Sequence, residues 1–143
     1  MYTSYITDKE ITALVDSIQT AESMTSGEIR VHIDSTTVRQ NAKMAWDVFR
    51  SLNMDQTKER NGVLFHVNFE QKYLTIIGDE GIHQHVKQYF WDKLHDEITK
   101  AFAQKKYFEA LRDAILKTGQ ELEKYFPTNG EHLNELPNEI SFS

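Results

Sequence analysis

The sequence contains no cysteine, which excludes a disulfide framework, a thiolate nucleophile and any metal site built on cysteine. It also has no apolar run near the ~20 residues that a membrane span requires. Its N-terminus, MYTSYITDKE, lacks the basic start and the apolar stretch of a signal peptide. We therefore expect a cytoplasmic protein that does not associate with membranes.

Positive charge is scarce as well. The chain has 16 Lys and Arg against 22 Asp and Glu, a net charge of −6, and its densest basic cluster is Lys105-Lys106. This balance disfavours binding to a nucleic-acid backbone and favours binding of a cation. The length of 143 residues, with 39% hydrophobic and 27% charged residues, indicates one globular domain, which we expect to be a monomer.

Hydrophobic periodicity predicts an alternation of helices and strands. A capping pattern at Thr7 and Glu10 starts the first helix, and Pro127 stops the last one. Gly119 inside the last helix suggests close packing against a neighbour. Helices are expected over 8–24, 42–52, 83–102 and 107–125, and strands over 28–33, 63–69 and 73–77, with a possible short edge strand over 139–142.

The order of these elements predicts an α/β fold with a small mixed sheet. The strand over 28–33 alternates apolar and polar residues, which indicates a half-buried strand at or near an edge. It joins the next strand through a helix, so the two should be parallel, and the third should pair antiparallel in a hairpin. The segments 25–28, 60–62 and 78–81 should therefore meet at one edge, with Glu22 above it.

Acidic residues at this edge suggest a divalent-cation site. Asp79 and Glu80 lie between two glycines, and Glu22 or Glu28 could join them as oxygen ligands. Asp113 could add a further carboxylate if the last helix crosses the site. The alternative is that Asp79 caps the following helix and Glu80 stabilises its first turn.

Arg60 and the histidines each leave two interpretations open. Arg60, with Asn61, could contact an anion beside the metal, although a salt bridge to Glu28 or Asp79 is favoured. Of the six histidines, His83 and His85 face different sides of a helix, and His32 and His66 lie in separate strands. Solvated or core histidines are therefore favoured over a zinc site.

Several segments together resemble the TPM domain family, named for a thylakoid lumen protein, a photosystem II repair protein and a nematode receptor modulator. The likeness is to its short cytoplasmic bacterial branch, without the signal peptide and C-terminal membrane segment of exported relatives. The matching pieces are ESMTSGEIRVHI over 22–33, the segment 49–54, Thr57, Arg60–Leu64, Ile77–Ile82, Trp91 and Asn134–Pro137. They suggest a TPM-like domain over 1–127 and a polar C-terminal tail over 128–143.

The resemblance implies a three-layer α/β/α sandwich around a mixed sheet of three to four strands. It also implies a divalent cation in acidic loops, with calcium favoured over magnesium, and one plant member is described as an acid phosphatase. The metal-ligand hypothesis names Asp79, Glu80, Glu22 and Asp113. A metal-dependent phosphatase using the same edge and an adaptor protein without a ligand are the alternatives, although neither an Asp-x-Asp nor an Arg-His-Gly motif occurs.

Overall fold

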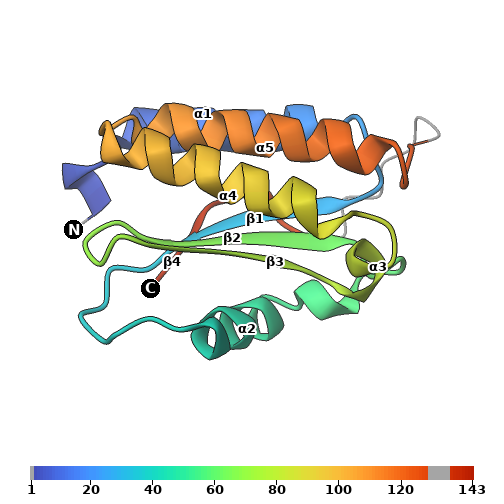
Figure 1. Cartoon of the computed structure of the whole chain (residues 1–143), viewed down its shortest axis with the longest axis horizontal. Helices are drawn as coiled ribbons and strands as arrows, with labels where there is room; N and C mark the ends of the chain where they lie inside the picture. The colour runs from blue at the N-terminus through green and yellow to red at the C-terminus, as the bar shows by residue number, and fades with distance from the viewer. Residues whose placement is uncertain (1, 129–135) are drawn as a thin grey trace.

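The computed structural model describes residues 2–128 and 136–143, so Asn134 and Glu135 of the resembling motif lie outside the described residues. A four-stranded sheet separates two helical layers (Figure 1). In chain order the elements are η1 (Tyr2–Ser4), α1 (Asp8–Glu22), β1 (Glu28–Ile33), α2 (Ala42–Ser51), η2 (Met54–Gln56), β2 (Gly62–Asn68), β3 (Tyr73–Gly78), α3 (Glu80–His83), α4 (Gln88–Ala103), α5 (Tyr107–Glu123) and β4 (Ser141–Phe142).

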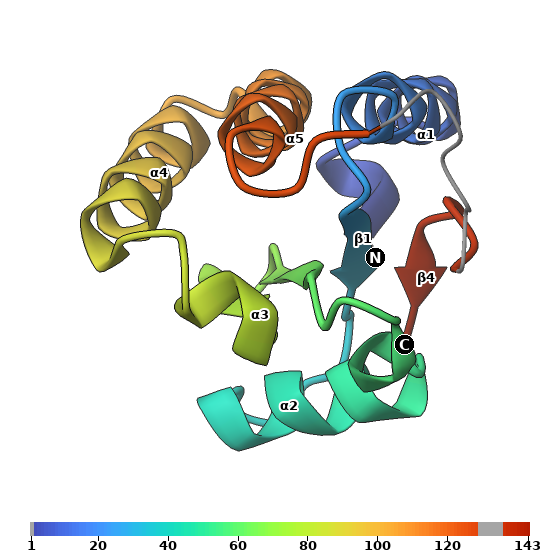
Figure 2. The same cartoon turned by 90° about the vertical axis from the view of Figure 1, so that its right-hand side faces the viewer.

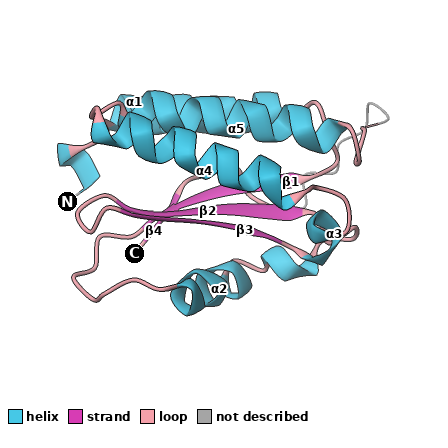
Figure 3. Cartoon of the chain, viewed as in Figure 1, coloured by secondary structure: helices cyan, strands magenta, loops and turns pink. Residues whose placement is uncertain are grey.

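The sheet has the strand order β3-β2-β1-β4. β1 is parallel to β2 and to β4, whereas β3 is antiparallel to β2, which confirms the mixed sheet. Helices α1, α4 and α5 cover one face and α2 covers the other (Figures 1 and 3), and the end view separates the same layers (Figure 2). The three-layer α/β/α sandwich is therefore confirmed.

The helical layer above the sheet follows from local sequence. Thr7 Oγ1 accepts from the Glu10 backbone N–H at 3.1 Å, and Glu10 Oε1 accepts from the Thr7 N–H at 3.0 Å, so the predicted capping box is present. A Cβ at Gly119 would lie 2.8 Å from Cα and Cβ of Ala21. The glycine therefore lets α5 approach α1 closely, as its position in the sequence suggests.

Two local predictions are wrong. The strand over 28–33 is not half-buried, because all six residues of β1 are buried. Its polar side is covered by the C-terminal segment, where Arg30 Nη2 donates to the Glu139 carbonyl at 3.3 Å. The helix expected over 83–102 begins at Gln88 instead, after a connection in which Val86 is buried, and a separate short helix, α3, precedes that connection.

The described end of the chain packs onto the domain. β4 pairs with β1 through His32↔Ser141 and Ile33↔Phe142, so the short edge strand is confirmed. Leu136 and Ile140 are also buried. Among the described residues, no helix combines the length and the apolar character needed to cross a bilayer. The C-terminal segment thus completes the sheet and covers the side chains of β1.

Candidate metal sites at the two ends of the first strand

The three predicted loops do meet at one edge of the sheet. Glu28 is paired with Gly62, and Val63 with Gly78, so β1 and β2 begin where β3 ends. The backbone N–H of Glu28 donates to the Asn61 carbonyl at 3.3 Å. This edge, which we call the acidic corner, comprises Glu22, Ser26, Glu28, Glu59, Arg60, Asn61, Asp79 and Glu80.

Arg60 engages both oxygens of Asp79. Its Nε lies 2.8 Å from Asp79 Oδ2 and its Nη2 lies 3.0 Å from Oδ1, the bidentate geometry of a strong charge-assisted pair. Asp79 also accepts the Glu80 backbone N–H at 2.7 Å as the cap of α3. The capping alternative for Asp79 and the salt-bridge alternative for Arg60 are thus the ones observed. Glu80 lies 3.6 Å from Arg60 and is 65% exposed.

Asp113 lies elsewhere. It pairs with its neighbour Arg112 at 3.1 Å and lines the groove between α4 and α5, close to Glu97 and Lys117. α5 reaches the acidic corner through other residues, because Leu122 lies 2.8 Å from the position of a Cβ on Gly27. The structure therefore gathers Glu22, Asp79 and Glu80 near one edge but does not bring Asp113 to them.

The buried acids of the corner are Glu22, at the end of α1, and Glu28, at the start of β1. Their exposed fractions are 3% and 0%, and Glu22 Oε2 accepts the Ile29 N–H at 2.8 Å. Burial raises the pKa of Glu22 to about 9; the Ile29 N–H opposes the shift, whereas the charge and hydrogen bond of Glu28 add to it. Glu22 therefore keeps its proton at neutral pH, hydrogen-bonded to Glu28.

Neutral oxygen donors accompany this pair. Asn61 is 1% exposed, and its Nδ2 donates to Ser26 Oγ at 3.3 Å and to Glu59 Oε2 at 3.1 Å. Its Oδ1 is buried and has no hydrogen-bond partner among the residues that the structure describes. Carboxylate, amide and hydroxyl oxygens are the donor set of a hard cation such as Ca²⁺, so the residues present fit such an ion.

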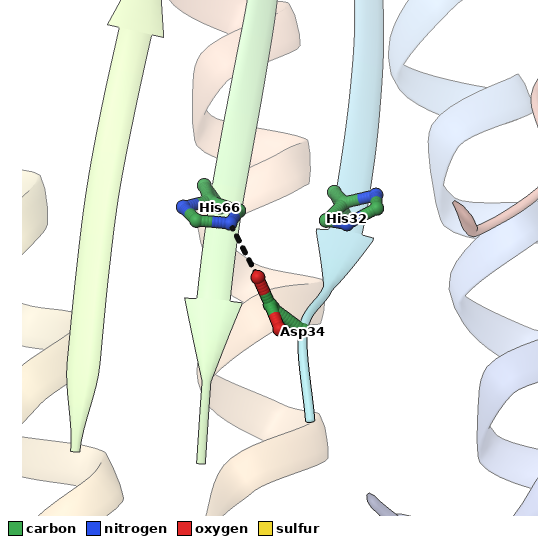
Figure 4. Close-up of side chains that lie close together, drawn as sticks. All are labelled: His32, Asp34 and His66. Carbon is green, nitrogen blue, oxygen red and sulfur yellow. Dashed lines mark ion pairs between the residues drawn. The ribbon is translucent and has the colours of Figure 1, made fainter. Parts of the chain in front are cut away.

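A second group of potential ligands lies towards the opposite end of β1. His32 and His66 are direct partners across the parallel pair β1–β2, with stacked rings 5.5 Å apart. Asp34 follows β1, and its Oδ2 is 3.6 Å from His66 Nε2 (Figure 4). Within the described parts of the chain, His32, Asp34 and His66 form a group that could hold a metal ion, because their ligand atoms lie within 4.8 Å of one another.

The two imidazoles are neutral near pH 7. Burial lowers the pKa of His32 to about 4; His66 adds to this shift and Asp34 opposes it. Burial also lowers the pKa of His66, against the opposing charge of Asp34. The pKa of the Asp34 carboxyl is lowered: burial raises it, but the Thr36 hydrogen bonds and the two histidines outweigh burial. Neutral imidazoles and an ionised carboxylate are the protonation states that ligate metals.

Sequence reasoning missed this group because it treated separate strands as separating their histidines. The signal depends on the exact strand bounds: in the structure His32 is the fifth residue of β1 and His66 is the fifth residue of β2, whereas the expected strand over 63–69 makes His66 its fourth residue. Two parallel strands that begin at the same edge in register place their fifth residues side by side.

The architecture and these two groups define a class: a small α/β/α domain with candidate metal-ligand sites on its sheet. The family model of the TPM domain matches residues 1–121. The chain therefore belongs to the TPM domain family.

Two solved structures are similar to this chain. The BA42 protein of the psychrophilic bacterium Bizionia argentinensis, solved by NMR, is 44% identical, with a TM-score of 0.90 over 97% of this chain and 96% of that one. The N-terminal domain of a protein from P. gingivalis shares the fold at 16% identity, with a TM-score of 0.70 over 85% of this chain and 79% of that one. A comparison with curated protein sequences finds no match.

Proposed function

We propose that this TPM domain is a cytoplasmic divalent-cation-binding domain, with its hard-cation site at the acidic corner. The observation that supports the proposal best is the buried carboxyl pair of Glu22 and Glu28. Two acids enclosed together repel one another when both are ionised, and a divalent cation in place of the proton of Glu22 removes that repulsion. The bound ion would then tie the end of α1 to the start of β1.

Calcium suits this corner better than magnesium. Ca²⁺ accepts six to eight oxygens in flexible geometry, whereas Mg²⁺ requires a near-ideal octahedron. The donors come from separate segments, with Glu22 and Glu28 as carboxylates and Ser26 and Asn61 as neutral oxygens. Such an assembled site tolerates irregular positions, which favours the larger ion.

The proposal assigns the remaining candidate acids different roles. Glu80 contributes negative charge from the same edge, and Asp79 becomes a ligand only when Arg60 releases it, because both of its oxygens are engaged. Asp113 takes no part, since it lies in the groove between α4 and α5.

Calcium titration of the ¹⁵N-labelled chain, with magnesium in parallel, tests the proposal. We expect saturable shifts of the amide signals of Glu22, Glu28, Ile29 and Asn61, at lower concentrations of calcium than of magnesium. The melting temperature should also rise, because an ion at 100 times its Kd stabilises the fold by about 2.7 kcal/mol. Glu22→Gln should abolish these effects.

Asp113→Asn is the matched control, since it removes an exposed acid outside the corner. It should leave the calcium response unchanged. The proposal is wrong if millimolar calcium leaves the corner amides unperturbed, or if Asp113→Asn abolishes the response while Glu22→Gln preserves it.

The phosphatase alternative receives less support from the geometry. A metal-assisted hydrolase needs a cation, a positioned water and a donor for the phosphate. The candidate donor, Arg60, directs its Nε and Nη2 at Asp79 instead. Hydrolysis of a chromogenic phosphate ester that is lost in Asp79→Ala would favour this alternative, and hydrolysis that survives the substitution would place the activity elsewhere.

A further inference from the structure

His66 is an unusual buried residue. Its exposed fraction is 0%, and neither Nδ1 nor Nε2 has a hydrogen-bond partner among the residues that the structure describes. A neutral imidazole carries one N–H donor and one lone pair. A buried polar group without a partner costs about 1–3 kcal/mol, so native proteins seldom leave both ring nitrogens in this state unless something binds there.

The neighbours of His66 supply the remaining parts of a ligand set. Asp34 Oδ1 accepts the Thr36 N–H at 2.8 Å, while its Oδ2 faces His66 Nε2 at 3.6 Å, which is beyond hydrogen-bond distance (Figure 4). His32, 5% exposed, lies beside them on the next strand. The carboxylate is thus fixed through one oxygen and presents the other to the imidazoles.

The spacing matches a metal centre that needs only a small contraction. In tetrahedral zinc with bonds of about 2.0–2.1 Å, neighbouring ligand atoms lie about 3.3 Å apart. The three ligand atoms here lie within 4.8 Å of one another, and the Asp34–His66 separation of 3.6 Å is already close to the tetrahedral value. Closing the widest of these gaps requires a contraction of at most about 1.5 Å.

From this geometry we propose that His32, Asp34 and His66 form a second metal site, specific for a borderline transition-metal ion such as Zn²⁺. Two imidazoles and one carboxylate are ligands of zinc and of related divalent transition metals, whereas calcium requires oxygen donors throughout. The site is therefore chemically distinct from the acidic corner, and its existence does not depend on calcium binding there.

The C-terminal segment contacts His32 and can supply the outer hydrogen bond of the site. His32 Nδ1 is 2.7 Å from Ser141 Oγ, and His32 Nε2 is 2.7 Å from Ser143 Oγ. One ring nitrogen must leave its serine to bind the ion, while the other keeps its serine as the outer hydrogen bond that orients a metal-bound imidazole. The ion would thus hold β1, β2 and the chain end together.

Metal-free full-length protein, prepared with a chelator, is titrated with Zn²⁺ by calorimetry and with Co²⁺ as a visible-absorption probe. We expect one equivalent of each ion to bind. The ring-nitrogen NMR signals of His32 and His66 should shift on zinc binding, a response that a purely structural cluster lacks. Asp34→Asn and His66→Gln should each weaken zinc binding at least about tenfold, since even the loss of an outer hydrogen bond costs that much.

Two controls separate this site from others. His83→Gln/His85→Gln removes two exposed histidines and should leave zinc affinity unchanged, as should Glu22→Gln at the acidic corner. If His66→Gln does not fold, Asp34→Asn, which keeps the side-chain shape, and the wild-type ring signals decide. The proposal is overturned if no saturable zinc binding occurs, if the ring signals of His32 and His66 stay fixed, or if binding is lost only in the His83/His85 variant.

Discussion

Replacing Glu22 by glutamine should stabilise the protein, and the gain should grow with pH. Glutamine has nearly the same shape as glutamic acid and can still accept the Ile29 N–H that Glu22 Oε2 accepts at 2.8 Å. It does not ionise, so it never carries a buried charge beside Glu28. The substitution therefore removes the proton-dependent part of the stability and little else.

The sign and size follow from the pKa of Glu22. In the unfolded chain this carboxyl ionises near its ordinary pKa of 4.5, whereas in the folded protein it keeps its proton up to about 9. Between these values the folded state binds more protons, so the free energy of unfolding falls as pH rises. At 1.36 kcal/mol per unit, the loss reaches at most about 4 kcal/mol by pH 7.5, and Glu22→Gln should recover up to that amount.

Urea unfolding of wild type and Glu22→Gln, followed by far-UV circular dichroism at pH 5.0, 6.5, 7.5 and 8.5, measures the difference. We expect a small difference at pH 5.0, a steady rise towards pH 8.5, and equal slopes against urea. Glu80→Gln, at the same edge but 65% exposed, should stay within about 0.5 kcal/mol of wild type at every pH. A pH-independent difference, or a variant that is least stable at pH 8.5, would refute the reasoning.

Three further predictions concern the same scaffold. Calcium affinity should rise by up to about tenfold per pH unit between pH 6.5 and 8.5, because the Glu22–Glu28 pair must release a proton to bind the ion. Calorimetry in buffers of different ionisation enthalpy should detect the released proton. Calcium binding without proton release would contradict the protonation of this pair. The pKa of His32 is lowered to about 4 in the folded protein, so as pH falls His32 is protonated in the unfolded chain before it is protonated in the folded one. Up to about 3 kcal/mol of stability should therefore be lost between pH 6.5 and 4. His32→Asn should flatten that part of the curve of stability against pH, and an unchanged slope would contradict the prediction. Gly119→Ala should lower the free energy of unfolding by up to about 2 kcal/mol. Overpacking against Ala21 at 2.8 Å costs about 1–3 kcal/mol, which outweighs the gain of about 1 kcal/mol in helix propensity. A variant more stable than wild type in urea unfolding would show that α1 and α5 can move apart without loss of stability.

The acidic corner was predictable because it follows from connectivity. A helical crossover makes β1 and β2 parallel and a tight turn makes β3 antiparallel, so their ends must meet at one edge. These rules require only the order of the elements. They placed Glu22, Glu28 and Asp79 near one another without any knowledge of side-chain contacts.

The use of each acid was not predictable in the same way. Arg60 has a φ of 52°, in the left-handed region that non-glycine residues seldom adopt, where neighbouring Asn61 or Gly62 would be the expected choice. With this backbone conformation the guanidinium of Arg60 binds both oxygens of Asp79. Glu22 and Glu28, rather than Asp79 and Glu80, then form the buried pair of carboxyl groups. Such a choice depends on the packed loop, which local sequence patterns do not encode.

The alternation of apolar and polar residues in β1 correctly predicts a strand, but it wrongly suggests that the polar face meets water. Period-two polarity identifies one face of a strand, and for an ordinary half-buried strand that face meets water. Here Arg30 is paired across the sheet with buried Leu64, and His32 with buried His66, beneath α2 and the C-terminal segment. The C-terminal segment that covers these side chains lies more than 100 positions away in the chain, so no local sequence pattern could predict it.

This polar interior is also the physical reason to look for ligands there. An alternating strand that faces water satisfies its polar side chains without constraint, but a buried one must supply a partner for each. Arg30 finds the Glu139 carbonyl and His32 finds two serine hydroxyls. Neither ring nitrogen of His66 has a hydrogen-bond partner within the described residues, although Asp34 Oδ2 lies 3.6 Å from His66 Nε2. Arg30 leaves only its Nε without a hydrogen bond, whereas His66 leaves both of its ring nitrogens without one. A missing ligand explains this state of His66 better than poor packing does, and zinc titration distinguishes the two.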